Sequence, residues 1–311
     1  MKKIVWLLMM VVMPMVMMPM VANAAFSRNV DLEDEDELFH RLDQYIARRD
    51  EFSSKKEKKL IRMKKKLNLT SGKRERLSLY NQIYREYYTY RYDSAMVYAN
   101  RGLQLAEQLH DAYYIDLNKI NRAAVLSTGG FYSQAEDLLL SLNPEDISPK
   151  LRQYYYYTLT WVYNYWESFC ERSEFKEGML DKKRLYLAKT LEYVGNKQSA
   201  LYYYLSGELE YLLHRTDKKV LDWYQKALAA SSVDSRVHAS SAYCIARYYH
   251  DNEQMDLYEK YLVEAAISDQ VCPLKENLAL QELSTYLYNK DAKYAKRVSK
   301  YIYCSMEDAQ F

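Results

Sequence analysis

The side chains with the strongest chemistry are scarce in this chain of 311 residues, and they stand apart from one another. None of the five histidines has a cysteine or carboxylate at the spacing that would place two metal ligands, or an acid and a base, on one helix face. The chain also has no Gly-x-Ser-x-Gly, no His-Glu-x-x-His and no glycine-rich loop that would hold a phosphate. We therefore predict that the protein is not an enzyme, has no catalytic residues, and uses neither a cofactor nor a metal.

The four cysteines leave two states open. Their even number would allow disulfides in an oxidising compartment, but their spacings match no metal or redox motif. A buried free thiol on a helix is the favoured state for each of Cys170, Cys244, Cys272 and Cys304.

Tyrosine indicates function more clearly, because its ring gives contact area while its hydroxyl can bind a ligand. The chain has 34 tyrosines, and the segment Arg152–Trp166 alone holds six of them with two tryptophans. As a helix, this segment carries Tyr156, Leu159, Thr160 and Tyr163 on one face, and Tyr154, Tyr157, Trp161 and Tyr165 on another. The first face is predicted to pack the helix and the second to meet a partner. Ordinary packing stays open as the alternative for the second face and for most other tyrosines.

These aromatic residues need a framework that positions them, and the composition favours a helical one. Glycine and proline number only 7 and 5, so few residues interrupt helices. Apolar residues recur at spacings of three and four, and polar turns break this pattern at intervals of about 20 residues. The sequence therefore predicts antiparallel helix pairs in an all-α protein.

The helix pairs share residues at the same offsets, which indicates a repeat. The pattern of Tyr211, Val220, Tyr224 and Ala227 returns one repeat later in Tyr248, Leu257 and Tyr261, and again in Tyr286 and Ala295. Residues of the same kind occur earlier at Ala95, Ala99, Gly130, Tyr132 and Ala135. A small residue lets two helices cross closely while a large neighbour fills the space beside it. All of these residues are predicted to pack the repeats.

These positions resemble the tetratricopeptide repeat (TPR), in which an aromatic residue of helix A packs on a small residue of helix B. The resemblance implies an α-solenoid, a right-handed superhelix of about five to six divergent TPR-like helix pairs. Helix A lines the concave surface in this family, which implies a candidate binding surface at Tyr154, Tyr157, Trp161, Tyr165, Tyr202 and Tyr249. Glu208 and Glu282 depart from the pattern, since helix A normally has small or apolar residues there.

The domain organisation follows from these patterns. Residues 1–24 are predicted to form a signal peptide and residues 32–68 a leading charged helical hairpin. The repeat array is placed at 73–304, with repeats at 73–110, 111–142, 149–194, 197–231, 235–268 and 273–304. The third repeat is expected to contain an extended connection at Cys170–Arg184. Residues 305–311 are expected to end the chain short of further helices.

The first residues favour export. Lys2 and Lys3 precede an apolar stretch, Ile4–Val21, and Ala22-Asn23-Ala24 fits the site that signal peptidase cleaves. An uncleaved membrane anchor is the alternative, because the stretch approaches the length that spans a bilayer. We expect an exported, periplasmic protein, and the formal charge of only +2 gives no support to binding of nucleic acid.

The leading hairpin divides its charge. Asp31–Glu37 holds six acidic residues, whereas Lys55–Lys66 holds eight basic residues and one acidic residue, Glu57. One interpretation is a capping hairpin whose two halves offset each other's charge. The other is a cationic helix face that binds an anionic membrane or an acidic partner. The first interpretation is favoured.

Three segments carry a narrower resemblance: Leu42–Leu67, Tyr92–Ala106 and Tyr301–Phe311. They are similar to the periplasmic N-terminal region of an uncharacterised Bacteroides-type family of membrane-bound TPR/helix-turn-helix regulators. The resemblance implies a periplasmic sensory part that binds a protein, a peptide or a glycan. It implies no nucleic-acid contact by this segment, and membrane attachment only through a further C-terminal helix or an uncleaved signal. A free-standing periplasmic scaffold or a glycan-binding accessory protein is the alternative.

Overall fold

The structure, a computed structural model, describes residues 34–170, 174–273 and 278–309. The expected signal peptide at 1–24 lies outside these residues. The described chain is helical, without strands, and most of its helices form antiparallel pairs. The pairs are α3 (Lys73–Tyr87) with α4 (Tyr92–Gln108), α5 (Ala112–Thr128) with α6 (Tyr132–Leu140), α7 (Pro149–Phe169) with α8 (Lys176–Tyr193), α9 (Ala200–Leu213) with α10 (Lys218–Ala229), α11 (Arg236–Asp251) with α12 (Met255–Val271), and α13 (Leu278–Lys290) with α14 (Ala295–Ala309).

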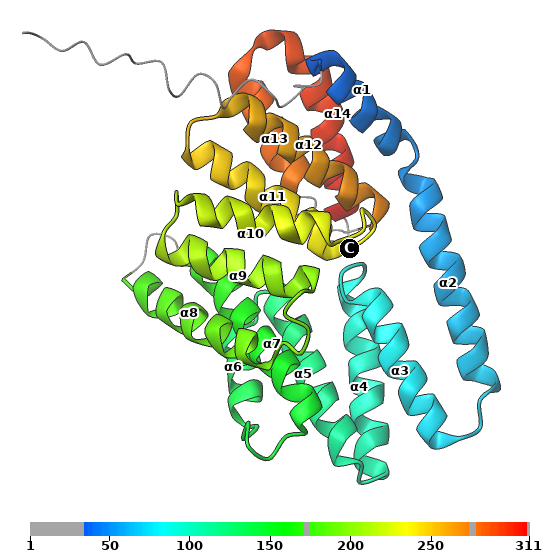
Figure 1. Cartoon of the computed structure of the whole chain (residues 1–311). Coiled ribbons are helices and arrows are strands. Elements are labelled where there is room, and N and C mark those ends of the chain that lie inside the picture. The colour runs from blue at the N-terminus through cyan, green and yellow to red at the C-terminus, as the bar shows by residue number, and fades with distance from the viewer. Residues whose placement is uncertain (1–33, 171–173, 274–277, 310–311) are drawn as a thin grey trace, which may run out of the picture.

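The pairs stack in sequence order into one curved array (Figure 1). Polar side chains begin several helices: Asp111, Ser199 and Ser235 each accept a hydrogen bond from a backbone N–H in the first turn of the helix that follows. Gly130 ends the turn between α5 and α6 with φ +83°, a conformation that costs glycine little. The all-α solenoid of TPR-like pairs predicted from the sequence is confirmed. No helix in the described part of the chain is long and apolar enough to cross a membrane.

Most of the residues expected to pack the repeats lie inside the array. The fully or nearly fully buried ones are Ala95, Ala99, Ala135, Val220, Ala227, Tyr211, Tyr224 and Tyr248, while Tyr132, Leu257, Tyr261 and Tyr286 are half-buried. Ala295 and Gly130 are corrections: Ala295 is exposed at the start of α14, and Gly130 is exposed in the turn before α6, where it packs against no neighbour. The 3₁₀ turn η1 (Ala292–Tyr294) precedes it and turns Tyr294 inward, so Tyr294 and Val298 take the core positions.

The connection expected to be extended at Cys170–Arg184 is a second correction. Helix α8 begins at Lys176, so most of the segment is helical. Lysine, glutamate, leucine and methionine fill this stretch, and all four have high helix propensity. The third pair therefore has two helices of ordinary length.

The leading hairpin is a third correction. The helices α1 (Glu35–Ala47) and α2 (Arg49–Leu69) meet at Arg48 and barely contact each other. Helix α2 runs along the edge of the array, where Leu60 and Leu67 share a core with α3 and α4 (Figure 1). Helix α1 continues to the other end of the array and lies beside α12 and α14 (Figure 1).

Helix α1 joins the core of the last repeats. Leu38, Phe39, Leu42 and Ile46 are at most 4 % exposed and belong to the same apolar cluster as side chains of α9–α14. The physical reason is that a solenoid leaves an uncovered apolar face at its end, and the apolar stripe of α1 covers it.

The acidic residues of α1 also find their partners at that end. Glu35 accepts a hydrogen bond from Lys290 at 2.7 Å, and Asp43 accepts one from Lys300 at 2.8 Å. Burial works against the charge of Glu35, but hydrogen bonds from Lys290 and Tyr294 lower its pKa to about 2. The acidic residues of α1 therefore do not offset the lysines of α2.

A candidate binding pocket on the inner helices

Polar and aromatic side chains line a pocket of about 150 Å³. Its walls come from α7, α9 and α11, the first helices of three successive pairs, and from the start of α13. First helices line the inner side of a TPR array, so the pocket lies where the sequence placed a binding surface.

One wall is aromatic and comes from α7. The rings of Trp161 and Tyr165 lie 5.7 Å apart, and Tyr157 approaches Trp161 at 6.1 Å. From α11, the Arg236 guanidinium lies 5.4 Å from the centre of the Trp161 ring and donates a hydrogen bond of 3.2 Å to the Tyr165 hydroxyl. The same guanidinium lies 5.9 Å from the ring of Tyr88, directly after α3. Arg236 therefore ties the first repeat to the third and fifth at the pocket.

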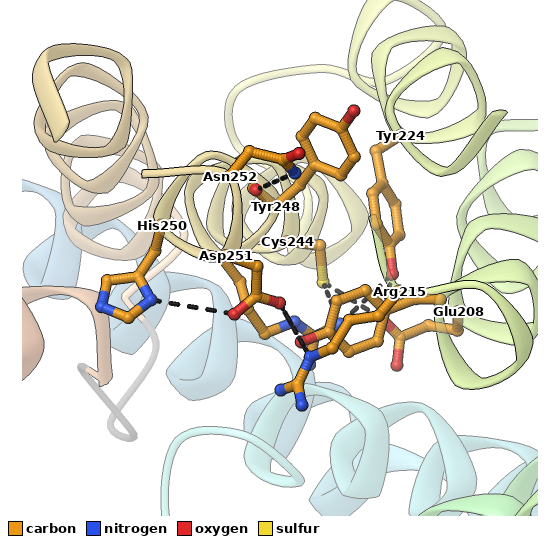
Figure 2. Close-up of polar contacts among 10 residues, drawn as sticks. Glu208, Arg215, Tyr224, Cys244, Tyr248, His250, Asp251 and Asn252 are labelled. Atoms are coloured by element: carbon orange, nitrogen blue, oxygen red, sulfur yellow. Dashed lines mark hydrogen bonds and ion pairs between the residues drawn. The ribbon is translucent and has the colours of Figure 1, made fainter. Parts of the chain in front are cut away.

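The floor is built around a buried carboxylate on α9. Glu208 Oε1 accepts hydrogen bonds from the Tyr224 hydroxyl at 2.6 Å, from Arg247 Nη2 at 2.8 Å and from the Cys244 thiol at 3.2 Å (Figure 2). Burial opposes ionisation, but the charges of Arg247 and Lys183 and the hydrogen bonds lower the pKa of Glu208 to about 2. Glu208 therefore holds a full negative charge inside the array.

The same burial keeps the neighbouring groups protonated. Burial and the nearby Glu208 charge raise the pKa of the Cys244 thiol far above its usual range, so the thiol serves as a hydrogen-bond donor. Arg247 lies with its guanidinium 3.9 Å from the centre of the Tyr211 ring. Tyr211 in turn donates to Asp251 at 2.7 Å, and Arg215 donates to the same carboxylate at 2.8 Å (Figure 2). The network holds Arg247 in one position at the pocket.

A second carboxylate has a similar arrangement two pairs further on. Glu282 of α13 accepts hydrogen bonds from the hydroxyls of Tyr243 and Tyr258, the latter at 2.8 Å. Tyr243 also lines the pocket. The two glutamates that depart from the repeat pattern are thus the anchors of the polar networks around the pocket.

Two buried donors at the pocket lack an acceptor among the described residues. They are the indole Nε1 of Trp161 and Nε of Arg247. A buried N–H without a partner costs free energy, and a side-chain movement that brought it to a ligand oxygen would recover that free energy. The pocket thus combines an aromatic wall, an anchored carboxylate and two unmatched donors, a combination suited to binding a polar ligand.

The residues predicted for the concave surface divide into two groups. Trp161 and Tyr165 line the pocket, and half-buried Tyr157 contacts Trp161. Tyr154 lies between helices, where it donates a hydrogen bond of 3.0 Å to Asn121, and burial raises its pKa to about 12. Tyr202 meets Trp223 of α10, at 6.4 Å, instead of the pocket.

Tyr249 is a correction. Its side chain is 7 % exposed and stacks on Tyr261 of α12 at 5.5 Å, so it packs α11 on its own partner helix. The pocket side of α11 is presented instead by Tyr243 and Arg247, which lie four residues apart. Sequence reasoning missed Arg247 and Arg236, and it missed Tyr204 of α9, which also lines the pocket. The available signal was Glu208, a carboxylate at a position that should be apolar.

The other reactive side chains do not gather into a site. All four cysteines are free thiols. Within residues 34–170, 174–273 and 278–309, no group of three or more histidine, cysteine, aspartate or glutamate side chains is arranged to hold a metal ion.

A family model described as the SusR N-terminal TPR domain matches residues 46–311. The match covers α2 to α14, together with the last residues of α1. No curated protein matches the chain.

Proposed function

Because this chain belongs to the family of SusR N-terminal TPR domains, whose repeats are protein-binding modules and generally not catalytic, we propose that it is the sensory part of a periplasmic envelope regulator. The regulator would control signalling or transcription, and the pocket between α7, α9 and α11 would receive its signal. The observation that carries this proposal is the pair of unmatched donors, Trp161 Nε1 and Arg247 Nε, beside the ionised Glu208.

A protein or peptide segment is the first candidate ligand. TPR modules bind extended segments along their inner helices, and backbone carbonyl oxygens of such a segment would accept from both donors. Trp161 and Tyr165 would pack against an apolar side chain next to those carbonyls.

A glycan is the second candidate, and the protein would then act as a glycan-binding accessory protein or a free-standing periplasmic scaffold. The favouring observation is the proximity of the Trp161 and Tyr165 rings to the charged groups of Glu208 and Arg247. A sugar ring stacks on an aromatic face while its hydroxyls bond to charged groups at the edge.

Replacing Trp161 tests the pocket directly. We expect Trp161→Ala to weaken ligand binding by about 30-fold, because it removes the largest aromatic wall and one of the two unmatched donors. Ligands would first be found by thermal-shift screening of a panel of peptides and oligosaccharides, and their affinities measured by calorimetry.

Trp223→Ala is the matched control. Trp223 lies on α10, where it stacks on Tyr203 at 6.0 Å, and does not line the pocket. Unchanged affinity in a folded Trp161→Ala variant would remove the pocket from the proposal. The panel also separates the candidates, since binding of peptides alone, or of oligosaccharides alone, selects one of them.

Export has its own test. We expect the mature protein to begin at Ala25, because cleavage after Ala24 follows the small-x-small rule. Expression of the full chain, fractionation of the cells and N-terminal sequencing would check this. A protein that keeps Met1 and stays in the membrane fraction would support the anchor alternative instead.

A further inference from the structure

The outer face of α2 is a cationic surface that the pocket does not use. Helix α2 turns Leu60 and Leu67 toward α3 and α4. On the opposite side, Lys58, Arg62 and Lys65 are exposed at spacings i, i+4 and i+7. They form a straight cationic row along the helix. Helix α2 is 21 residues long and lies at the edge of the array (Figure 1).

Neighbouring acidic residues do not offset this row. On α1, Glu35 pairs with Lys290 and Asp43 pairs with Lys300, both at the far end of the array. The lysines that flank the row have partners of their own: Lys55 with Glu51 at 3.1 Å, Lys59 with Glu86 at 2.7 Å and Lys66 with Glu75 at 3.5 Å.

The row itself stays unpaired in the described part of the chain: Lys58, Arg62 and Lys65 have no ion pair there. Three like charges on one exposed face repel each other, and each of them is fully available to an anionic partner.

Apolar side chains stand within the same surface. Ile61 is 61 % exposed and Leu69 is 79 % exposed, so two aliphatic side chains of α2 face solvent. Helices that lie in the interface of an anionic bilayer combine lysine and arginine with apolar side chains that enter the bilayer. The main apolar stripe of α2 is buried against α3 and α4, so Ile61 and Leu69 are its apolar side chains beside the cations. The lysine and arginine stems reach headgroup phosphates while the aliphatic groups enter the acyl boundary.

We propose that the outer face of α2, formed by Lys58, Ile61, Arg62, Lys65 and Leu69, docks on an anionic phospholipid surface. A linear row of cations matches a plane of phosphates better than it matches the confined charge of a single acidic loop. No residue of α2 lines the pocket, so the pocket would stay accessible to a ligand while α2 is bound to lipid. This inference stands apart from the proposed sensory function and does not depend on it.

Vesicle co-sedimentation of the mature chain tests the docking. We expect the protein to bind vesicles that contain phosphatidylglycerol at least about 10-fold more tightly than neutral phosphatidylcholine vesicles, and to be released at high salt. The variant Lys58→Gln/Arg62→Gln/Lys65→Gln should lose this preference. Circular dichroism would verify that the variant is folded.

A matched control separates this face from net charge. Lys150, Lys226 and Lys296 are exposed on α7, α10 and α14, so Lys150→Gln/Lys226→Gln/Lys296→Gln makes the same change in charge elsewhere. The control should keep the lipid preference. Equal losses in both variants, or equal binding of the wild type to both kinds of vesicle, would overturn the proposal; the second result is the one expected if the face serves an acidic protein.

Discussion

Glu208→Gln is expected to lower the free energy of unfolding by about 3 kcal/mol, one of the two largest effects that we predict for this chain. The substitution removes the charge that neutralises Arg247 and weakens acceptance from Tyr224 and Cys244. Arg247 keeps 29 % of its side chain accessible, so solvent recovers part of the loss and the effect stays below that of a fully enclosed pair. Urea unfolding of the wild type and the variant would measure it.

The pH dependence follows from the lowered pKa of Glu208. Its pKa is about 2 in the folded protein, against 4.5 for an ordinary glutamate. The unfolded chain therefore binds the proton more readily, and the stabilisation is fully present above pH 4.5. It is lost as the pH falls from 4.5 toward 2, so the difference in unfolding free energy between the wild type and Glu208→Gln should shrink over that range.

The double variant Glu208→Gln/Arg247→Met distinguishes a paired charge from simple packing. Removing both charges should restore part of the lost stability, because no uncompensated cation stays behind. If the single variant is as stable as the wild type, or if the difference does not depend on pH, then Glu208 is not ionised in the folded protein. The network beneath the pocket would then need a different account.

Local patterns were sufficient to predict the repeat array. Ala95, Ala135 and Val220 lie where the spacing placed them because a helix pair is a short-range structure, set by apolar periodicity and small crossing residues. The prediction that Ala295 packs the last repeat was wrong by one position, because the 3₁₀ turn before α14 shifts the helical register. The local sequence carries no strong signal for such a turn.

The position of α1 in the fold could not be predicted from local sequence patterns. Its contact between Glu35 and Lys290 joins residues 255 positions apart. The acidic and basic halves at 32–68 looked complementary because they are neighbours in sequence. The apolar stripe of α1, however, gains more by covering the open end of the last repeats than by lying on α2, whose inner face is already filled by α3 and α4.

The site was predictable in part. Trp161 and Tyr165 follow from helical geometry, because a helix of consecutive aromatic residues must turn some of them away from its packing face. Tyr249 could not be separated from its neighbours in the same way, since its burial depends on the position of Tyr261 across the helix pair. Arg247 was missed because its role depends on a carboxylate 39 residues earlier.

Phe39→Ala tests whether α1 covers the apolar end of the array. We expect this substitution to lower the free energy of unfolding by about 3–4 kcal/mol. Phe39 is 0 % exposed, lies 5.9 Å from the ring of Tyr294, and has the Arg297 guanidinium 4.4 Å from its own ring centre. Truncation would leave a cavity between α1 and α14 and remove these aromatic and cation–π contacts. Thermal and urea unfolding would measure the loss.

Phe131→Ala is the matched control, because Phe131 precedes α6 and is 48 % exposed. This substitution should lower the free energy of unfolding by less than about 1 kcal/mol. Hydrogen exchange gives a second measurement: Phe39→Ala should increase exchange in α1 and in α12 and α14, which lie beside it, but not in α3 to α6. A solvated leading hairpin would behave differently, since the loss of one of its side chains would leave the last repeats unchanged. Equal, small effects of Phe39→Ala and Phe131→Ala would therefore contradict the closed array and return α1 to the role of a terminal cap on the first repeat.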